Sequence, residues 1–242
     1  MKIIGVIPAR YNSSRFEGKP LADICGKPMI WWVYQQAKKV KEFSAVFVAT
    51  DDERIEKVCQ DYGIEVLMTA STHKTGTDRV AEVARQVGGD LFVNIQGDEP
   101  LIEPKMIQQV IEIFKDESVY FGTLKKEIKD RDAIQDMNTV KVVTDLKGDA
   151  LYFSRSAIPS NIKNGKVTRT YKHIGIYAYK RDFLFKYTTL PQTELEISES
   201  LEQLRAVEHG YKLRVHETEF ETIGVDMPEH IAFVEDILKN KL

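Results

Sequence analysis

Short apolar runs alternate with amphipathic stretches through about the first 115 residues of the chain. Buried strands are predicted for the runs KIIGVIPA, SAVFVATD, IEVLMT and DLFVNIQGD. Helical periodicity is found in KPMIWWVYQQAKKV, which Pro28 opens, in DERIEKVCQDYG, which stops at Gly63, and in TDRVAEVARQVGG and PKMIQQVIEIFKD. Strands separated by single helices predict a mainly parallel sheet, with ligands at the carboxyl ends of its strands.

The pattern changes after residue 120 or so. TVKVVTD and ALYFSRS flank LKGD and predict an antiparallel hairpin, and HIGIYAYK predicts a further strand. One helix is then expected over ELEISESLEQLRAVEHG, a strand over YKLRVHET, and a last helix opened by Pro228. The segment PSNIKNGKVTRTYK, with Asn161, Asn164 and Gly165, predicts a loop. The second half therefore reads as a smaller lobe beside the sheet, and such a lobe makes a cleft.

Composition and charge narrow the class of protein. The 242 residues carry a formal net charge of −3 with a pI near 6.0, which argues against nonspecific binding to nucleic acid. Cys25 and Cys59 form no disulfide framework, so reduced thiols in a cytoplasm are expected. No run approaches the ~20 apolar residues of a membrane span, and no membrane insertion is expected.

One loop gathers positive charge without a packing reason. IPARYNSSRFEGKPL places Arg10, Arg15 and Lys19 just after the first expected strand, with Glu17 as the one opposing charge. Backbone amides and a helix start at that edge can face an anion, and three cations suit a triphosphate better than a carboxylate. The loop has neither the Walker nor the dinucleotide glycine pattern. The alternative is a solvated basic loop.

The order of motifs resembles a known family. PARYNSSRFEGKPL followed by GKPMI, then HKTGTDRVAEV, NIQGDEP, ALYFSRSAIP, HIGIYAY with LEQLR, and GVDMPEH resemble the 3-deoxy-manno-octulosonate cytidylyltransferases (CMP-Kdo synthetases) nearly end to end. Acylneuraminate cytidylyltransferases differ at the segment QGDEP, and sugar-1-phosphate nucleotidyltransferases differ at the first loop. The resemblance implies a Rossmann-like, glycosyltransferase-A-like nucleotidyltransferase with helices on both faces of a mainly parallel sheet and a smaller mixed lobe.

The same resemblance implies an activity and a setting. CTP and a free 2-keto-3-deoxy sugar acid (Kdo) would give CMP-Kdo and pyrophosphate with Mg²⁺ as cofactor, in the cytoplasm, for lipopolysaccharide or capsule synthesis. A homodimer is implied, with Leu151 and Phe153 as candidates for core or interface. The nucleotide-binding part would be about 1–120 plus 212–242 of a single 1–242 domain, and the sugar-binding and dimerisation lobe about 121–211.

Site residues follow from the matched motifs. In the first part, the resemblance assigns nucleotide contacts to Ala9, Arg10, Ser13, Arg15, Lys19, Thr75, Gly76, Arg79 and Gln96. Catalytic roles are assigned to Arg10, Lys19, Asp98 and Asp226, the two carboxylates also being the expected metal ligands because Mg²⁺ takes one or two carboxylates plus substrate oxygens. Read alone, Asp226 is equally a helix cap, and Thr77 an ordinary N-cap.

The sugar acid is assigned to the second lobe. The resemblance gives Arg155 as its cation and His173, Tyr177, Glu202 and Gln203 as hydroxyl partners. Four residues apart in a strand, His173 and Tyr177 are predicted to share a face. Without the resemblance, a strand histidine is usually packed or solvated, and two polar residues beside a helical apolar stripe usually mark a solvated face.

Two departures from the family pattern leave the identity of the sugar acid open. Ser198 stands where relatives carry an apolar or small residue, and the loop SNIKNG is short. A related ulosonic acid such as 8-amino-Kdo is therefore an alternative substrate, and a nucleotide-binding regulator without catalysis is an alternative from another class. Retention of both carboxylates and all three cations argues against the regulator.

Overall fold

The computed structural model describes residues 1–13, 15–160 and 169–241, apart from the side chain of residue 241. These residues divide into two compact units, a first unit of Met1–Gln108 with Thr222–Leu242 and a second unit of Gln109–Glu221. Helix α4 (Pro104–Glu112) crosses the boundary. The sequence also predicts a nucleotide-binding part and a sugar-binding lobe, with boundaries near 120 and 212. These parts are defined by their ligands, so this division stays a prediction.

The first unit is built on four parallel strands, as the alternating pattern predicts. Strand β1 pairs with both β6 and β4, and β4 pairs with β5, all in parallel. Their bounds are β1 Ile3–Pro8, β4 Ala45–Thr50, β5 Val66–Met68 and β6 Leu91–Asn94. A short antiparallel hairpin of β2 (Asp23–Ile24) and β3 (Lys27–Pro28) stands apart from this sheet. The mainly parallel α/β architecture is confirmed.

Helices of the first unit begin at identifiable caps. Helix α2 (Glu53–Asp61) starts after Asp52, whose carboxylate accepts from the Arg54 amide, and α3 (Gly76–Val87) starts at a capping box formed by Thr75 and Asp78. Helix α1 (Met29–Lys38) has Pro28 at its N-cap, one position before the predicted place. The first unit also contains the 3-10 turn η1 (Lys19–Leu21) and helix α9 (His230–Lys241), which begins two residues after Pro228.

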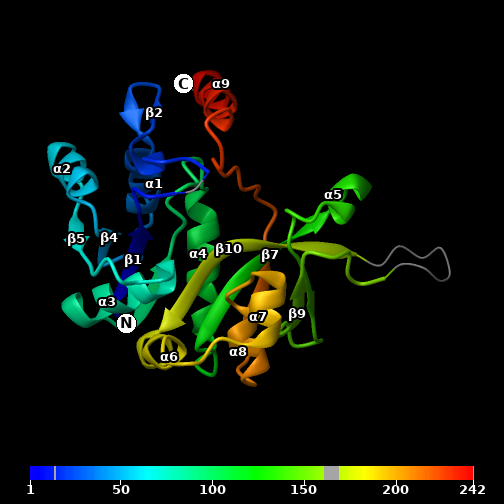
Figure 1. The fold of residues 1–242 in the computed structure, drawn as a ribbon. Coiled ribbons are helices and arrows are strands. Elements are labelled where there is room, and N and C mark those ends of the chain that lie inside the picture. The colour runs from blue at the N-terminus through cyan, green and yellow to red at the C-terminus, as the bar shows by residue number, and fades with distance from the viewer. Residues whose placement is uncertain (14, 161–168, 242) are drawn as a thin grey trace. The chain divides into compact units, whose positions relative to one another are not determined.

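Helix α9 closes the first unit although it comes from the far end of the chain. It packs with the β2–β3 hairpin and α1 through a buried cluster of Ile24, Met29, Leu101, Val225, Val234 and Leu238 (Figure 1). The Glu235 carboxylate also accepts from the Cys25 amide at 2.8 Å. The residues just before α9 are thereby fixed beside elements that lie 200 positions earlier in the sequence.

The second unit contains a mixed set of strands. Strand β10 (Thr170–Lys180) pairs antiparallel with β7 (Phe121–Ile128) and β8 (Lys141–Thr144), β8 pairs antiparallel with β9 (Ala150–Ser154), and β11 (Arg214–Glu217) runs parallel to β7. The predicted hairpin is β8–β9 and is confirmed. Strand β7 was not expected from the sequence.

Short helices complete the second unit, at η2 Ile113–Lys115, α5 Arg131–Gln135, α6 Arg181–Tyr187, α7 Glu194–Glu199 and α8 Leu204–Glu208. The single helix predicted over residues 194–210 is wrong, because Ser200 adopts a left-handed conformation (φ 53°) between α7 and α8. The predicted loop residues 161–165 lie outside the described part of the chain. No described helix has both the length and the apolar character needed to cross a bilayer.

Candidate active site

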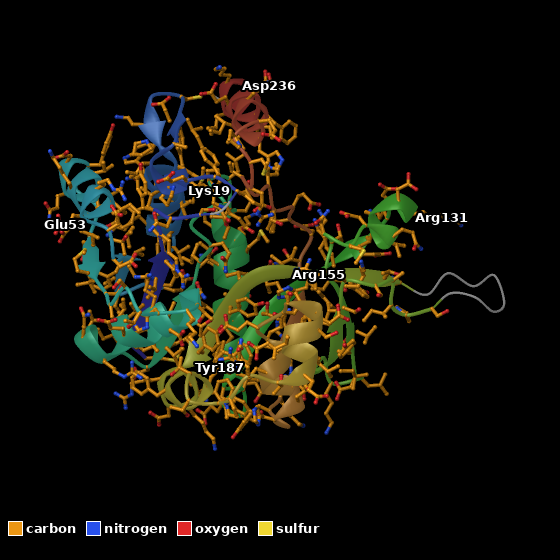
Figure 2. The ribbon with its side chains drawn as sticks, viewed as in Figure 1. Lys19, Glu53, Arg131, Arg155, Tyr187 and Asp236 are labelled. Carbon is orange, nitrogen blue, oxygen red and sulfur yellow. The ribbon has the colours of Figure 1, made fainter. Side chains whose placement is uncertain are left out.

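The cationic loop of the first unit is folded back on itself after β1. Gly18, at φ 68°, donates its amide to the Tyr11 carbonyl at 2.8 Å and leads directly into η1. That backbone conformation favours glycine. The turn fixes the start of η1, and with it the backbone of Lys19 (Figure 2).

Lys19 joins the loop to two carboxylates that are remote in sequence. Its Nζ lies 2.6 Å from Asp98 Oδ2 and 3.9 Å from Asp226 Oδ1. Arg15 Nη2 lies 3.2 Å from the same oxygen of Asp226. Two of the three predicted phosphate cations and both predicted metal ligands therefore form one charged cluster.

Backbone contacts bring these two aspartates together. The Val225 amide donates to the Asp98 carbonyl at 2.8 Å, which holds the segment before α9 against the turn after β6. A Cβ on Gly97 would stand 2.8 Å from the Pro8 carbonyl, so only glycine fits where this turn passes the end of β1. The close neighbour of Gly97 is therefore the chain itself.

Asp226 is not the cap of α9, because the helix begins four residues later at His230. The Asp226 amide instead donates to His230 Nδ1 at 3.1 Å, which assigns the proton of that imidazole to Nε2. His230 received no role from the sequence, and its spacing of four from Asp226 was the available signal.

A hollow of about 380 Å³ opens beside this cluster. Its lining includes six of the predicted residues, namely Ala9, Arg10, Ser13, Lys19, Gln96 and Asp98. The lining comes from the β1 loop and the turn after β6, which are carboxyl ends of neighbouring parallel strands. The position agrees with the rule for ligands on open parallel sheets.

A second hollow of about 290 Å³ shares Arg10 and contains Arg79. Arg79 is fully buried on α3, where Nη1 donates to Thr69 Oγ1 at 2.6 Å and Nη2 lies 3.2 Å from Asp51 Oδ2. Its Nε is buried and has no hydrogen-bond partner among the described residues. A guanidinium fixed in this way is a rigid donor for a planar acceptor such as a nucleotide base.

The loop HKTGTDR caps α3 as expected, with one change of position. Thr75, not Thr77, is the N-cap of α3, and Thr77 is buried in the first turn. A Cβ on Gly76 would meet only the Pro8 ring, at 3.5 Å, which is an ordinary contact. The chain itself therefore gives no packing reason for glycine at position 76, and the nucleotide contact expected there stays a prediction.

Tyr11 is enclosed by two neighbours that the sequence did not connect with it. The Arg54 guanidinium lies 3.2 Å from the centroid of the Tyr11 ring, and a Cβ on Gly18 would approach that ring to 3.2 Å. Arg54 donates hydrogen bonds to the Asp52 carboxylate from Nε at 2.9 Å and from Nη2 at 2.6 Å. These hydrogen bonds orient Arg54 and lower the pKa of the Asp52 carboxyl. Asp52, Arg54 and Tyr11 thus form a stack that supports the cationic loop.

The donor set at the carboxylate pair fits a magnesium ion better than a softer metal. No group of three or more His, Cys, Asp or Glu suited to a metal is found in the described ranges 1–13, 15–160 and 169–241. Mg²⁺ needs only one or two carboxylates because phosphate oxygens and water complete its shell. Asp98 and Asp226 reach the same ammonium group, so they can also reach one ion placed there.

In the second unit, His173 and Tyr177 share a face of β10 as predicted. Their ring centroids lie 5.3 Å apart, although β10 carries a bulge between Ile174 and Tyr177. Thr123 on β7 fills the bulge, with its hydroxyl donating to the Ile176 carbonyl at 2.7 Å and lying 3.1 Å from His173 Nε2. Burial lowers the pKa of His173 to about 3 and raises that of Tyr177, so both side chains are neutral at physiological pH.

Glu202 and Gln203 lie in the turn between α7 and α8 and not on one solvated helix face. Gln203 is 4% exposed, and its Nε2 is buried without a hydrogen-bond partner in the described part of the chain. The Glu202 charge contributes to raising the pKa of Tyr177, which places that carboxylate near the His173–Tyr177 pair. Three of the predicted sugar residues are thus gathered, with an unsatisfied amide beside Glu202.

The Arg155 side chain is fixed by hydrogen bonds to two backbone carbonyl groups. Its Nε donates to the Glu199 carbonyl at 2.8 Å and Nη1 to the Met137 carbonyl at 3.1 Å, which uses two of five guanidinium donors. The buried Lys141 ammonium donates to the Arg155 carbonyl, and burial lowers the pKa of Lys141. Lys141 was not predicted, because a lysine in a strand gives no sign of burial.

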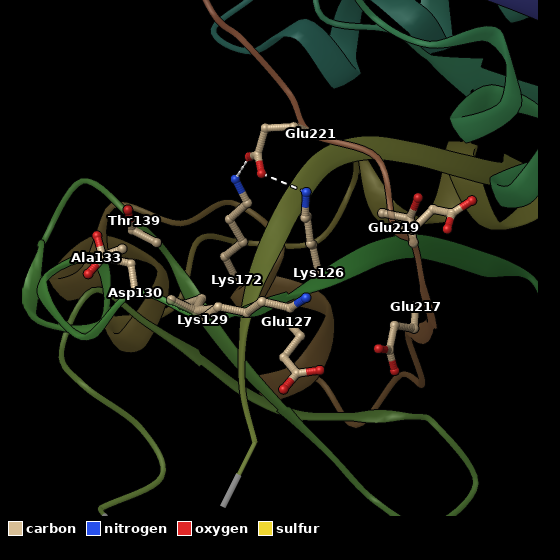
Figure 3. Close-up of a pocket in the computed structure, with 12 residues that line it drawn as sticks. Lys126, Glu127, Lys129, Asp130, Ala133, Thr139, Lys172, Glu217, Glu219 and Glu221 are labelled. Atoms are coloured by element: carbon tan, nitrogen blue, oxygen red, sulfur yellow. Dashed lines mark hydrogen bonds and ion pairs between the residues drawn. The ribbon is translucent and has the colours of Figure 1, made fainter. Parts of the chain in front are cut away.

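A larger hollow of about 510 Å³ in the second unit has a different character (Figure 3). Glu221 accepts from both Lys126 and Lys172, so these lysines are already neutralised. Glu127, Glu217 and Glu219 also line it. The hollow is therefore not suited to a polyphosphate, and its lining contains none of the predicted site residues.

Comparison with known proteins agrees with the motif order. A family model described as cytidylyltransferase matches residues 4–219. The 3-deoxy-manno-octulosonate cytidylyltransferase of Solibacter usitatus (strain Ellin6076) is 50% identical over 98% of this chain and 95% of its own length, and that of Fusobacterium nucleatum is 48% identical over 99% and 98%.

Solved structures give the same result. A structure described as CMP:2-keto-3-deoxy-manno-octonic acid synthetase complexed with CTP matches with a TM-score of 0.95 and 44% identity, covering all of both chains. A cytidylyltransferase from Leptospira borgpetersenii, at 16% identity over all of this chain and 88% of its own, shares the fold with a TM-score of 0.67. The chain is a nucleotidyltransferase and belongs to the 3-deoxy-manno-octulosonate cytidylyltransferase family.

Proposed function

We propose that this protein transfers a cytidylyl group from CTP to Kdo, a free 2-keto-3-deoxy sugar acid, and releases pyrophosphate. The observation that carries the proposal is the cluster in which Lys19 lies 2.6 Å from Asp98 and 3.9 Å from Asp226, beside a loop with two further cations. Relatives at 50% identity that are named for this activity support the choice of nucleotide and sugar.

The reaction is an in-line displacement at phosphorus. The hydroxyl oxygen on C2 of the sugar acid bonds to the α-phosphorus, the bond from that phosphorus to the bridging oxygen breaks, and pyrophosphate leaves with the electron pair while the hydroxyl proton goes to solvent. Such a displacement requires charge compensation and alignment more than covalent chemistry. Arg10, Arg15 and Lys19 would hold the triphosphate and stabilise the departing pyrophosphate.

Magnesium would be held by Asp98 and Asp226 together with phosphate oxygens. When bound, it supplies neutralisation of phosphate charge and acidifies the sugar hydroxyl. The two carboxylates would hold it beside the cationic loop, because the hydrogen bond from the Val225 amide to the Asp98 carbonyl ties their backbones together.

The base would bind beside Arg79, with contacts from Thr75, Gly76 and Gln96. The buried guanidinium of Arg79 cannot turn, since Thr69 and Asp51 hold two of its nitrogens. A fixed donor distinguishes N3 of cytosine, which accepts a hydrogen bond, from N3–H of uracil, which donates one, more sharply than a mobile donor does.

The sugar acid would bind in the second unit, with its carboxylate on Arg155. Its hydroxyls would meet the neutral imidazole of His173, the phenol of Tyr177, the Glu202 carboxylate and the buried amide of Gln203. The unpaired Nε2 of Gln203 is a donor that a sugar hydroxyl would satisfy.

An 8-amino sugar acid remains the second candidate substrate, on the sequence departures alone. Ser198 is exposed on α7, and the short loop falls mostly in residues 161–168, outside the described chain. The structure therefore adds nothing in favour of the amino sugar, and Kdo is the better proposal.

The test is a pyrophosphate-release assay with CTP, UTP, ATP and GTP against Kdo, 8-amino-Kdo, an acylneuraminic acid and glucose 1-phosphate. We expect turnover with CTP and Kdo that stops when EDTA removes the metal. Turnover with only another nucleotide or acid would refute the proposed substrates. CTP binding by calorimetry with no pyrophosphate from any acid would favour the regulator.

For assembly and setting, we propose a homodimer acting in the cytoplasm in lipopolysaccharide precursor synthesis. Support comes from large apolar side chains that the second unit exposes, Leu151 on β9 at 59% and Ile197 on α7 at 63%. Phe153, the other interface candidate, is fully buried. Sedimentation of the wild-type protein and of Leu151→Glu tests the dimer, since a dimer built on this surface should dissociate in the variant.

A further inference from the structure

The cations meant for the triphosphate are paired in this structure with the carboxylates meant for the metal. Lys19 Nζ contacts Asp98 and lies between Asp98 and Asp226, and Arg15 contacts Asp226. We propose that Lys19, aided by Arg15, competes with a divalent cation for these two carboxylates. A nucleoside triphosphate would release the carboxylates by binding both basic side chains through its phosphates. The inference rests on the proposed function only for the identity of the nucleotide.

Position gives the first argument. An ammonium nitrogen between two carboxylates occupies the place that a shared metal ion needs. A divalent ion bound there with Lys19 in its present position would stand next to a like charge. Because like charges a few ångströms apart repel strongly even at the surface dielectric, metal and ammonium exclude each other.

Charge balance gives the second argument. Asp98 and Asp226 carry two negative charges, and Lys19 and Arg15 carry two positive charges, so the cluster is neutral without a metal. A triphosphate adds several negative charges to the loop and is a better partner for an arginine fork and a lysine than a single carboxylate is. Once the cations turn to the phosphates, the two carboxylates are left with unbalanced charge, which a divalent ion restores.

Exposure ranks the two cations. The Lys19 side chain is 16% exposed, whereas that of Arg15 is 65% exposed. Exposed ion pairs are screened by solvent and contribute little, while a less exposed pair is screened less. Lys19 is therefore the main competitor and Arg15 a minor one.

The consequence is cooperative binding of nucleotide and metal. By linkage, if the triphosphate tightens metal binding, the metal tightens triphosphate binding by the same factor. A coupling of about tenfold or more is expected, within the usual range for two linked sites. The chain alone should bind the metal weakly.

Mn²⁺ is the probe, and its binding is measured by electron paramagnetic resonance without nucleotide. Lys19→Met keeps the length of the side chain and removes its charge, so Mn²⁺ affinity should rise about tenfold. Arg15→Gln should raise it only about twofold. Lys39→Met, a lysine at the end of α1, is the matched control and should leave Mn²⁺ affinity unchanged.

The second arm adds a CTP analogue with a methylene group between the α- and β-phosphorus. The analogue should tighten Mn²⁺ binding to the wild type about tenfold and to Lys19→Met by a much smaller factor. Lys19→Gln serves as a second variant if Lys19→Met melts at a lower temperature than the wild type.

Equal or weaker Mn²⁺ binding by both Lys19 variants without nucleotide would overturn the exchange. So would a coupling factor that the variants leave intact. Failure of the proposed function is a separate result, since an enzyme without CTP turnover would still show the gain in Mn²⁺ affinity in the nucleotide-free arm.

Discussion

The predicted binding residues of the two units are held in place in opposite ways. In the first unit, the side chains are charged and partly exposed, and they pair with each other, as Lys19 does with Asp98. In the second unit, burial keeps His173 and Tyr177 neutral, and Gln203 has a buried amide nitrogen without a partner in the described part of the chain. One set is balanced by exchangeable ion pairs, and the other is fixed by packing.

The difference reflects the ligands proposed for each unit. A triphosphate with a metal brings many charges. In the free protein the charged side chains of the site neutralise one another, and in the complex the phosphates and the metal neutralise them. A sugar acid brings mostly hydroxyl groups, which are recognised by fixed neutral donors and acceptors in a partly buried place. Variants in the first unit should therefore act through charge, and variants in the second through hydrogen bonds and packing.

The largest expected effect comes from removing one carboxylate of the first unit. Asp98→Asn and Asp226→Asn keep the shape of the side chain, and kcat should fall about 10²–10³-fold or more, because charge stabilisation in the transition state is lost. Pyrophosphate release measures the loss, and the melting temperature should stay near that of the wild type. Asp61→Asn, an exposed carboxylate on α2, is the control.

Normal turnover in Asp98→Asn would remove the metal role and with it the contrast between the units. A loss of folding in both variants would show that the cluster is structural. In that case the ion pairs would be fixed contacts and not exchangeable ones.

Gln203→Leu tests the second unit, because here stability and function should move in opposite directions. A buried amide without a partner costs about 1–3 kcal/mol, so an apolar side chain of similar size should raise the free energy of unfolding by about 1 kcal/mol. The KM for the sugar acid should rise about tenfold, while the KM for CTP stays constant. Urea unfolding and steady-state kinetics measure the two effects.

A destabilised Gln203→Leu protein would mean that its amide has a structural partner. Gln135→Leu, on an exposed glutamine at the end of α5, is the matched control and should change neither quantity. An unchanged KM for the sugar acid would remove Gln203 from the binding set.

The fold of the first unit was predictable because its strands and helices follow local patterns. All four parallel strands and their helices lie where the apolar periodicity places them, with shifts of one or two residues at most ends, although β6 and α4 each end four residues before the predicted boundary. The pairing of Asp98 with Asp226 was expected only through the resemblance to a family. It depends on the Val225–Asp98 hydrogen bond and on packing of α9, neither of which local sequence shows.

The second unit was harder to predict because tertiary contacts override its local signals. Strand β7 was missed, since a buried start at Phe121–Leu124 is followed by two lysines and gives neither alternation nor a long apolar run. The break at Ser200 lies within helix-forming sequence. It is held by the buried Glu196–Arg205 pair and by the Tyr187 hydroxyl, which donates to the Glu202 carbonyl at 2.7 Å.

Burial of His173 makes the stability of the protein depend on pH. The unfolded histidine binds a proton below its ordinary pKa near 6.5, whereas folded His173 does not do so until about pH 3. Between these values the unfolded state binds more protons, so folding stability falls as the pH falls, by about 1.4 kcal/mol per pH unit well below 6.5. Burial and Arg214 also lower the pKa of His216, which adds to the slope.

His173→Gln should lower this slope between pH 6 and pH 4.5, as measured by thermal or urea unfolding, while the contribution of the exposed His216 remains. A His173→Gln protein with the full slope would show that His173 is protonated in the folded state, and the neutral character assigned to the second unit would be wrong.

The smallest expected effect comes from the stack of Asp52, Arg54 and Tyr11 behind the cationic loop. Arg54→Gln removes a cation from the Tyr11 ring, a contact that is weak at an exposed site. The KM for CTP should therefore rise about 2–5-fold, with kcat and the KM for the sugar acid unchanged, if the stack only positions the loop. A drop in kcat of the size expected for Asp98→Asn would instead place Arg54 on the phosphates.

Tyr11→Leu separates the two roles, because it removes the ring and leaves the cation. If the stack positions the loop, Tyr11→Leu should raise the KM for CTP at least as much as Arg54→Gln does. If Arg54 acts on the phosphates directly, Tyr11→Leu should leave kcat near that of the wild type while Arg54→Gln does not.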